Sequence, residues 1–333
     1  MQQCQPLPNS VIDLALASCV FSSAPDVGKL SHRNEPIKLA DFASLLENIR
    51  RQDDLGVWHM GDNLSFESFG ALGTILSGSP TLGIALQKFT QAFPLVQSNS
   101  SLVMTISEDK ARINYRVLDP GIWPRRGDAE ITIAFLFSIL TRFKVPISAI
   151  SHVGFEHEMD RGGHAVAHQL FCRTSFSRLE NYLVFPSEVM SLPNPQPRET
   201  QRTEFGDQWC DVLSQLKARQ RNSSVSDKVR ERVFSRLGKA TVNQNAVAME
   251  LGMSERTLRR GLSQEATSYK LLLEECRGSF AIALLSRTKL PLSEIALLLG
   301  YSDQTAFSRA FSKFAGHPPS ELRSKGAEGL SLN

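Results

Sequence analysis

The last third of the chain carries hydrophobic residues at helical spacing and shows no strand pattern after about residue 225. Within residues 243–264, two hydrophobic pairs each lie four positions apart, which places each pair on one helix face: Val247 with Leu251, and Leu258 with Leu262. Between the pairs, Gly252 tolerates the positive φ that often ends a helix, and Ser254 is a good N-cap residue. The pattern predicts two helices joined by a tight turn, a helix-turn-helix unit.

A second unit of the same kind follows at residues 292–316. We expect Ser293 to cap its first helix and Gly300 to end it. Either Ser302 or Asp303 then caps the next helix. That helix carries phenylalanines at i, i+4 and i+7, which predict one buried stripe: Phe307, Phe311 and Phe314. Its other face is short, weakly charged and rich in hydrogen-bonding groups, which suits a binding surface.

Residues 268–287 separate the two units and are apolar at helical spacing, at Leu272, Leu273, Cys276, Phe280, Ala283 and Leu284. This spacing predicts one long helix that holds the two units rigidly. The order of helix, glycine turn and polar helix therefore occurs twice. The equivalent positions Leu258 and Phe307 are 49 residues apart.

The polar faces of the second helices are the candidate binding surfaces. A DNA major groove admits one α-helix, in which arginine can bond guanine and glutamine can bond adenine through paired hydrogen bonds. Helix N-termini also offer free N–H groups to phosphates. In the first unit we predict contacts from Ser254, Arg256, Thr257, Arg259, Arg260 and Ser263. In the second unit we predict contacts from Asp303, Gln304, Thr305, Ser308, Arg309 and Lys313.

The front of the chain mixes helical and strand-like patterns. The helical patterns cover roughly residues 38–51, 64–92 and 127–143. Two strand-like runs meet at a tight polar junction and predict a hairpin: residues 101–109 and 111–119. Further strand-like runs are residues 150–158 and 181–186. The mixture predicts an α+β domain, a small sheet with helices packed on it, followed by an all-α domain.

The domain boundary follows from a change in composition. Residues 191–200 contain three prolines, which exclude a helix or a central strand. A helical segment follows at 203–219, and the polar stretch 218–227 breaks it. We therefore predict a front domain at 10–200, a helix and linker at 201–227, and a back domain at 228–325 that carries the candidate DNA-binding helices. The helix at 203–219 either forms a dimerisation stripe or docks on its own domain.

Charge is distributed unevenly along the chain. The 333 residues are 41% hydrophobic and 21% charged, an ordinary composition for a soluble globular protein, and carry a formal net charge of +3. Residues 226–333 hold 16 Lys and Arg against 11 Asp and Glu, a net +5, whereas the remainder holds 21 against 23, a net −2. A basic back third favours a polyanionic partner.

The sequence indicates neither membrane insertion nor secretion. The longest apolar run, residues 131–140, is about half of the roughly 20 residues that a spanning helix needs, and it predicts a buried helix. The apolar stretch 11–21 has no Lys or Arg before Lys29, so we expect a cytoplasmic protein. The five cysteines form no C-x-x-C pair and predict reduced, mainly structural thiols, with a redox sensor as the alternative: Cys4, Cys19, Cys172, Cys210 and Cys276.

Other candidate chemistries are weaker. Four histidines invite a metal-site interpretation: His152, His157, His164 and His168. The last two are spaced i, i+4, which zinc sites use, but no H-E-x-x-H is present, and we interpret all four as surface or packing histidines. Asp128 and Glu130 suit the first turn of a helix rather than a catalytic pair. Residues 73–83 are rich in Gly and Ser but lack the P-loop pattern. We predict no metal, no cofactor and no enzymatic activity.

Residues 243–323 resemble the C-terminal DNA-binding domain of AraC/XylS-type transcriptional regulators. The matching strings are "VAMELGMSERTLRRGL" and "LSEIALLLGYSDQTAFSRAFSKFAGHPPSELR", and the second is the more specific. The resemblance implies two helix-turn-helix motifs joined by a linker helix and reading adjacent major grooves on one DNA face. It assigns the reading to Arg256, Arg259 and Arg260 in the first motif, and to Gln304, Thr305 and Arg309 in the second. Leu322 departs from the pattern, where an aromatic residue often stands, and we expect an effect on packing only.

The front of the chain resembles the N-terminal domain of the subgroup similar to ornithine-utilisation and quorum-sensing regulators, often labelled arabinose-binding-like. The matching strings are "FGALGTILSGSPTLGIALQKF", "VLDPGIWPRRGDAEITIAFL" and "NYLVFPSEVMSLPNPQPR", and the match covers most of residues 10–200. This resemblance implies a sensing or dimerising role and does not establish arabinose as the ligand.

Together these features predict a transcription factor whose front domain senses a small-molecule effector or dimerises and whose back domain binds double-stranded promoter DNA. RNA polymerase is a further expected partner if the protein is an activator, a homodimer is expected, and no membrane partner is. One alternative is a ligand-independent regulator whose front domain only makes protein contacts. Another is an enzyme fused to a DNA-binding module, which the lack of a catalytic constellation in the sequence argues against.

Overall fold

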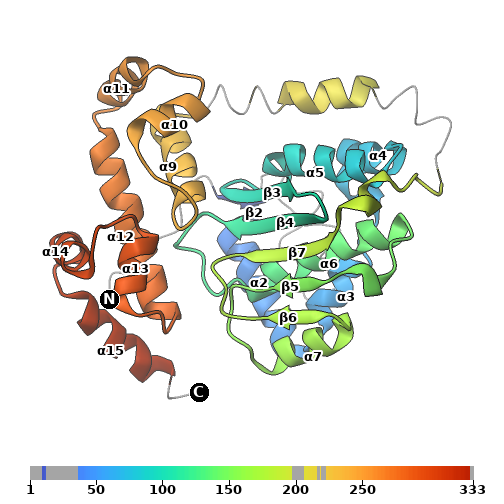
Figure 1. Cartoon of the computed structure of the whole chain (residues 1–333), viewed down its shortest axis with the longest axis horizontal. Helices are drawn as coiled ribbons and strands as arrows, with labels where there is room; N and C mark the ends of the chain where they lie inside the picture. The colour runs from blue at the N-terminus through green and yellow to red at the C-terminus, as the bar shows by residue number, and fades with distance from the viewer. Residues whose placement is uncertain (1–9, 13–36, 197–205, 216–217, 219–222, 331–333) are drawn as a thin grey trace. The chain divides into compact units, whose positions relative to one another are not determined.

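The computed structural model describes residues 10–12, 37–196, 206–215, 218 and 223–330. The described residues up to 218 form one compact unit, the N-terminal domain, and those from 223 form a second, the C-terminal domain (Figure 1). Cys4, Cys19, residues 13–21 of the apolar stretch and the end of the proline-rich stretch lie outside the described residues.

A five-stranded sheet forms the centre of the N-terminal domain. Its strands lie in the order β3 (Ser100–Ile106), β4 (Lys110–Val117), β7 (Asn181–Pro186), β5 (His152–Gly154) and β6 (Arg173–Ser175). Neighbours are antiparallel except for the parallel pair β5 and β6. The predicted hairpin is confirmed, because β3 and β4 pair along their whole length. The strand predicted at 150–158 is shorter, since the chain after Gly154 leaves the sheet.

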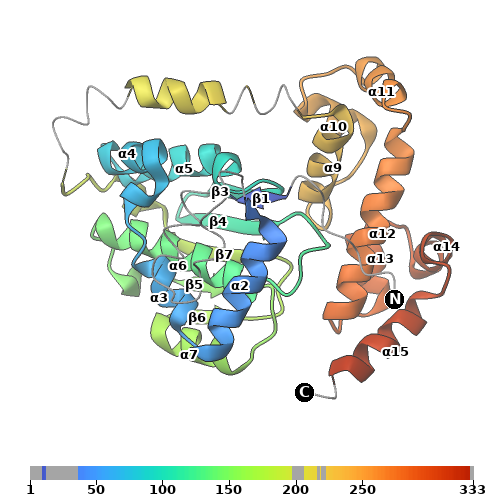
Figure 2. The ribbon, with the colours of Figure 1, turned by 180° about the vertical axis from the view of Figure 1, so that it is seen from behind.

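Three helices cover one face of this sheet. Helix α6 (Arg126–Arg142) packs on β4 and β7, and α2 (Leu39–Gln52) and α3 (Gly56–Asp62) pack on α6 (Figure 2). Residues of α6 are buried around almost its whole circumference, as expected for a helix in the middle of a core. The prediction that the apolar run 131–140 is a buried helix is therefore confirmed.

The helical pattern predicted at 64–92 is divided in the structure. It contains a 3-10 helix (Phe66–Phe69), α4 (Gly70–Gly78) and α5 (Leu82–Val96). Helix α5 starts afresh because the Thr81 side chain accepts a hydrogen bond from the amide of Ile84, and α5 packs on β3. The smaller elements are β1 (Val11–Ile12), β2 (Ile37–Lys38), α7 (Arg161–Leu170) and 3-10 helices at Ile147–Ala149 and Ser187–Ser191.

The helix predicted at 203–219 is described at residues 206–215. Val212 is buried in the core of the N-terminal domain, and the Lys88 ammonium of α5 lies 3.7 Å from the centre of the Trp209 ring. These contacts support docking on its own domain over a free dimerisation stripe. The apolar spacing in the sequence predicts a stripe of Phe205, Trp209, Val212, Leu213 and Leu216 on this helix, of which Phe205 and Leu216 lie outside the described residues.

The C-terminal domain is helical, with no strand in the described stretch 223–330. Its helices are α9 (Val225–Arg236), α10 (Gln244–Glu250), α11 (Glu255–Gln264), α12 (Tyr269–Arg287), α13 (Leu292–Leu298), α14 (Gln304–Ala315) and α15 (Pro319–Leu330). The predicted long helix is α12, whose N-terminus is capped by Ser268. It packs against α9, α14 and α15. Across the described residues of both domains, no helix is long and apolar enough to cross a membrane.

Candidate nucleic-acid interface

The first helix-turn-helix unit, α10 and α11, is built as the sequence predicts. Gly252 adopts a φ of +65° in the turn, a conformation that costs a residue with a Cβ more than it costs glycine. The Ser254 Oγ then accepts a hydrogen bond from the amide of Thr257 at 3.1 Å and caps α11. Leu258 and Leu262 are completely buried. Because this pair fixes the inner face of α11, the polar residues between them point outward.

The second unit, α13 and α14, repeats this construction. Gly300 adopts a φ of +76°, and the Asp303 Oδ1 accepts a hydrogen bond from the amide of Ala306 at 2.8 Å. This bond and the one from the Ser302 hydroxyl lower the pKa of Asp303. Of the two predicted caps, Asp303 is therefore the residue that caps α14, and Ser302 supports it.

The predicted Ser293 cap is wrong. Helix α13 begins at Leu292, directly after Pro291, and no side chain caps it. Ser293 is thus the second residue of the helix, past the position from which a side chain reaches the free amides of the first turn. The fixed φ of a proline suits the entry to a helix, so the helix starts earlier than the serine predicts.

Of the three phenylalanines predicted to form a buried stripe, only two are buried. Phe307 and Phe311 are 1% and 2% exposed, but Phe314 is 42% exposed. The Phe314 ring lies across Gly278 of α12, where an added Cβ would come within 2.4 Å of it. The absence of a side chain at Gly278 therefore lets the end of α14 approach α12 closely.

The twelve predicted contact residues lie on α11, α14 and the caps of these helices. Eleven of them are exposed and Ser308 is half-buried. Arg259 Nη2 lies 3.7 Å from Glu255 Oε2, one turn earlier on α11, and the Arg259 side chain is 68% exposed. The structure thus presents two capped polar helices, each held by a buried apolar pair, with their cations accessible to a polyanion.

Arg277 of α12 supports the second unit and was not predicted. Its Nη2 donates a hydrogen bond to the Gly300 carbonyl at 3.0 Å, and its guanidinium lies 4.7 Å from the centre of the Tyr301 ring. Arg277 therefore fixes the turn before α14 from the linker helix. No local pattern could have identified it, because the two positions are 23 residues apart.

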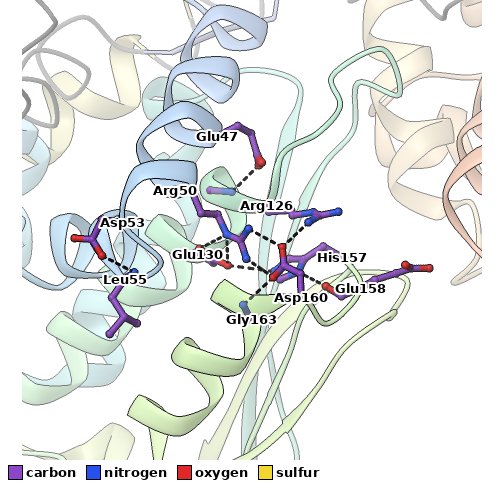
Figure 3. Close-up of polar contacts among 11 residues, drawn as sticks. Glu47, Arg50, Asp53, Leu55, Arg126, Glu130, His157, Glu158, Asp160 and Gly163 are labelled. Carbon is purple, nitrogen blue, oxygen red and sulfur yellow. Dashed lines mark hydrogen bonds and ion pairs between the residues drawn. The ribbon is translucent and has the colours of Figure 1, made fainter. Parts of the chain in front are cut away.

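A network of buried and half-buried charged residues lies between α2, α6 and the start of α7 in the N-terminal domain (Figure 3). Arg50 Nε donates to both carboxylate oxygens of Glu130, at 2.9 and 3.0 Å. Its Nη1 and Nη2 donate to Asp160 at 2.7 and 2.5 Å. Burial raises the pKa of Glu130 to about 7, while hydrogen bonds from Arg50 and Gly163 hold the pKa of Asp160 below its usual range. These contacts give Glu130 a structural role.

The histidines do not form a metal site. Burial lowers the pKa of His157 to about 4, and its Nδ1 lies 2.9 Å from the Glu158 carbonyl. His152 Nε2 contacts the Ser175 hydroxyl at 2.9 Å. Among the described residues, no three His, Cys, Asp or Glu side chains are grouped so that they could hold a metal ion.

The described cysteines are free thiols: Cys172, Cys210 and Cys276. Burial raises the pKa of Cys276 to about 12, which leaves it protonated and unreactive at neutral pH. Cys276 therefore belongs to the packing of α12.

Comparison with known proteins agrees with this construction. A family model described as a helix-turn-helix domain matches residues 247–325, and one described as the arabinose-binding domain of the AraC transcription regulator, N-terminal, matches residues 26–194. The chain is 30% identical to the ornithine utilization regulator of Pseudomonas aeruginosa over 79% of this chain and 77% of that protein. It is 29% identical to an uncharacterized HTH-type transcriptional regulator of Mycobacterium tuberculosis, over 83% and 81%.

A solved structure, that of the transcriptional regulator CdpR from Pseudomonas aeruginosa, covers 93% of this chain and 96% of its own, with 17% identity and a TM-score of 0.43.

The fold and the two capped polar helices define a DNA-binding protein with paired helix-turn-helix motifs. The chain belongs to the AraC family, and it is a DNA-binding transcriptional regulator.

Proposed function

We propose that α11 and α14 of one protomer read two adjacent major grooves of a promoter, with the twelve exposed or half-buried polar residues as contacts. One observation carries this proposal: both units place a capped polar helix over a buried apolar pair, and α12 connects them without a break. Arg256, Arg259 and Arg260 make the base or phosphate contacts of the first half-site. Gln304, Thr305 and Arg309 make those of the second.

We further propose that a small-molecule effector bound to the N-terminal domain controls this binding in a cytoplasmic homodimer. The name of the similar ornithine utilization regulator supports a link to metabolism, although it describes that protein alone. If the protein is an activator, it contacts RNA polymerase. A ligand-independent regulator is the alternative, and a protein whose DNA binding no metabolite alters would favour it.

We propose that the protein is not an enzyme. The acidic residues that the sequence offers for catalysis, Asp128 and Glu130, are held by Tyr115 and Arg50 inside the N-terminal domain. Turnover of any metabolite that alters DNA binding would contradict this.

The test is a footprint of the full chain on its genomic promoter sites. Two readers one helical turn apart, about 34 Å or 10 bp, predict a protected half-site pair of about 20 bp. Inserting about 5 bp between the halves rotates one of them to the opposite DNA face and should abolish specific binding. An insertion of about 10 bp is the control for distance alone. Equal binding to the native and the 5-bp site would reject the rigid two-motif arrangement.

A further inference from the structure

The face of the five-stranded sheet opposite α6 carries polar side chains. Alternate residues of a strand point to opposite faces, and the face that α6 covers carries completely buried residues such as Ile113, Leu183 and Val153. The strand register places the intervening residues in two rows on the other face, which we call the polar face: Arg112, Val184, His152 and Arg173 in one row, and Asn114, Tyr182, Gly154 and Ser175 in the next.

Tyr182 forms the floor of the polar face. It is 6% exposed, and its ring lies across Gly154, where an added Cβ would come within 2.2 Å of it. The Tyr182 hydroxyl lies 3.1 Å from the Ser175 hydroxyl and 3.2 Å from His152 Nε2. These three polar groups are therefore fixed relative to one another across β5, β6 and β7.

Two arginines are attached to this floor. The guanidinium carbon of Arg112, on β4, lies 3.7 Å from the centre of the Tyr182 ring. Arg178 lies in the turn between β6 and β7, and its Nε donates a hydrogen bond to the Ser175 hydroxyl at 3.1 Å. The two guanidiniums thus approach the same pair of hydroxyl groups from different elements.

Arg173 brings a third guanidinium to the same place. It is the cross-strand neighbour of His152 in the parallel pair β5 and β6, and it is exposed. Burial and the charges of Arg173, Arg178 and Arg112 lower the pKa of His152. The three cations therefore act together on one part of the polar face, where the electrostatic potential is positive.

These cations are not balanced by carboxylates. Glu180 Oε1 lies 3.8 Å from Arg112 Nη2, but the charge of Glu180 also stabilises the buried Arg116 cation. Among the described residues, Arg173 and Arg178 have no carboxylate partner. Because like charges repel one another, two unbalanced cations beside a third favour a bound anion.

A phosphate monoester fits this arrangement. An arginine fork donates paired hydrogen bonds to phosphate or carboxylate oxygens, so both groups are candidates. At pH 7 a phosphate monoester carries a charge of about −1.5 to −2 and three acceptor oxygens, which matches two unbalanced cations. Its oxygens also point in three directions, toward guanidiniums that come from β4, β6 and the turn before β7, whereas a carboxylate offers one charge and one plane.

We propose that Arg112, Arg173 and Arg178 bind the phosphate group of a small phosphate monoester on the polar face. The Ser175 and Tyr182 hydroxyls lie at the base of this site. The proposal names the chemical class of the effector described above and rests on that function. Arg173 and Arg178 supply the charge, and Arg112, stacked on Tyr182, closes the site from β4.

The experiment is an isothermal titration of the full chain with phenyl phosphate, against phenyl sulfate and succinate as matched probes. Phenyl sulfate has nearly the same shape with a single negative charge, and succinate carries two charges on separate carboxylates. We expect phenyl phosphate to bind at least about fivefold more tightly than either probe. Equal binding of phenyl sulfate or of succinate, or no binding of phenyl phosphate, would each overturn the proposal.

Arg173→Gln combined with Arg178→Gln tests where the phosphate binds. Both side chains are exposed, so the melting temperature should stay unchanged, while affinity for phenyl phosphate should fall at least about tenfold through the loss of charge-assisted hydrogen bonds. The control is Arg51→Gln combined with Arg161→Gln, which removes the same charge from two exposed arginines of the same domain. Unchanged binding by the first variant, or an equal loss in both, would overturn the proposal. If the first variant does not fold, its two single substitutions are measured against the same control, and no loss in either would overturn the proposal.

Promoter binding separates a small ligand from DNA as the source of the phosphate. Without phenyl phosphate, the double variant Arg173→Gln, Arg178→Gln should bind promoter DNA in a gel shift as the unaltered chain does. A loss of promoter affinity in this variant would assign the cations to the DNA backbone and overturn the proposal. Specific promoter binding by the unaltered chain without binding of phenyl phosphate rejects the phosphate site alone. Absence of specific promoter binding by the folded, unaltered chain rejects the proposed function.

Discussion

The two domains differ in how far they bury charged and polar side chains. Apart from Tyr269, every buried polar or charged side chain among the described residues lies in the N-terminal domain, between Ser10 and Asn194. The polar helices α11 and α14 instead leave their cations in solvent. Arg50 and Arg259 are the same residue type, yet the first joins three elements in a core and the second lies in solvent with only an exposed partner, Glu255.

This difference separates the effects that substitutions should have. A buried ion pair strongly destabilises a fold when one partner is removed, because the other charge stays behind in a medium of low polarity. An exposed cation contributes little to stability, but it can neutralise a phosphate. Substitutions in the N-terminal network should therefore lower the free energy of unfolding, and those on α11 and α14 should lower affinity for DNA.

The largest expected effect is that of Arg50→Ala. It removes the donor that bridges Glu130 and Asp160 and leaves the Glu130 carboxylate, which is 1% exposed, in the core without its cation. The free energy of unfolding of the N-terminal domain should fall by about 3–5 kcal/mol, measured by urea unfolding of the full chain. The control is Arg161→Ala, which breaks a pair with Asp54 in which the arginine is 91% exposed and should cost less than about 1 kcal/mol. Equal effects would show that burial of an ion pair does not decide how much its loss destabilises the fold.

A comparable loss is expected inside the C-terminal domain for Phe311→Ala. Phe311 is 2% exposed, and truncating a buried phenylalanine costs about 3–5 kcal/mol. Phe314→Ala, three residues on and 42% exposed, should cost less, about 1 kcal/mol. Thermal melting of the two variants, with DNA binding measured below each melting point, tests this. A larger loss for Phe314→Ala would show that its contact with Gly278, rather than the buried pair, holds α14.

A pH-dependent effect of about 3 kcal/mol is expected from His157. Burial lowers its pKa to about 4 from 6.5, so the unfolded chain binds a proton before the folded one does. Its contribution to stability is complete above pH 6.5 and is lost as the pH falls toward 4. Burial raises the pKa of Asp128 and Glu130 to about 7, which acts in the opposite direction over this range.

The comparison of His157→Gln with the unaltered chain isolates the histidine. Relative to the variant, the unaltered chain should lose free energy of unfolding between pH 6.5 and 4, measured by urea titration at each pH. A constant difference across this range would mean that His157 has an ordinary pKa.

The two domains also differ in how far their sequence predicts them. In the C-terminal domain the signals are local: Gly252 and Gly300 adopt positive φ, and Ser254 caps the helix that follows it. Where a local signal is wrong, the predicted end of the helix is shifted by a residue or two. Ser293 was predicted to cap α13, but the helix begins at Leu292. The buried network is not local, because Arg50 lies 80 residues from Glu130 and 110 from Asp160. The sequence predicted the helices that carry Arg50 and Glu130, but neither α7, which Asp160 caps, nor the pairing of these residues.

Asp128 shows the same limit in the core of the N-terminal domain. In the sequence it is an acidic residue in the first turn of a helix, which the helix dipole accounts for. Only the packing of α6 against α5 and β4 places it beside Tyr115 and under phenylalanine rings. The twelve predicted DNA contacts required no such knowledge, since helical periodicity alone turns them away from a buried pair. Their roles on DNA remain predictions.

Arg309→Ala should act on DNA binding and not on folding. Arg309 is exposed on α14, and loss of a paired contact to a base edge costs about 1–3 kcal/mol. Affinity for the promoter site should fall, discrimination at one base pair of the second half-site should relax, and the melting temperature should stay unchanged. A random-sequence duplex is the control. An equal loss on both duplexes would mean that Arg309 contacts phosphate only.

The smallest effect, and the sharpest comparison, comes from replacing one glutamate by glutamine in each domain. Glu255→Gln breaks the exposed i, i+4 pair with Arg259 and removes a favourable charge from the first turn of α11. Such terms contribute about 0.3–1 kcal/mol. Glu130→Gln keeps the same shape but discharges the partner of Arg50 in the core, and it should destabilise several times more.

Glu255→Gln should also strengthen promoter binding slightly, because α11 loses a negative charge and Arg259 becomes free to meet a phosphate. Isothermal titration at about 50 and 200 mM salt measures this, and the gain should shrink at the higher concentration, where a charge effect is screened. A gain in affinity that is the same at both salt concentrations would show that Glu255 acts through the shape of the helix. A loss of affinity would show that Arg259 reads DNA only while Glu255 holds its side chain in place.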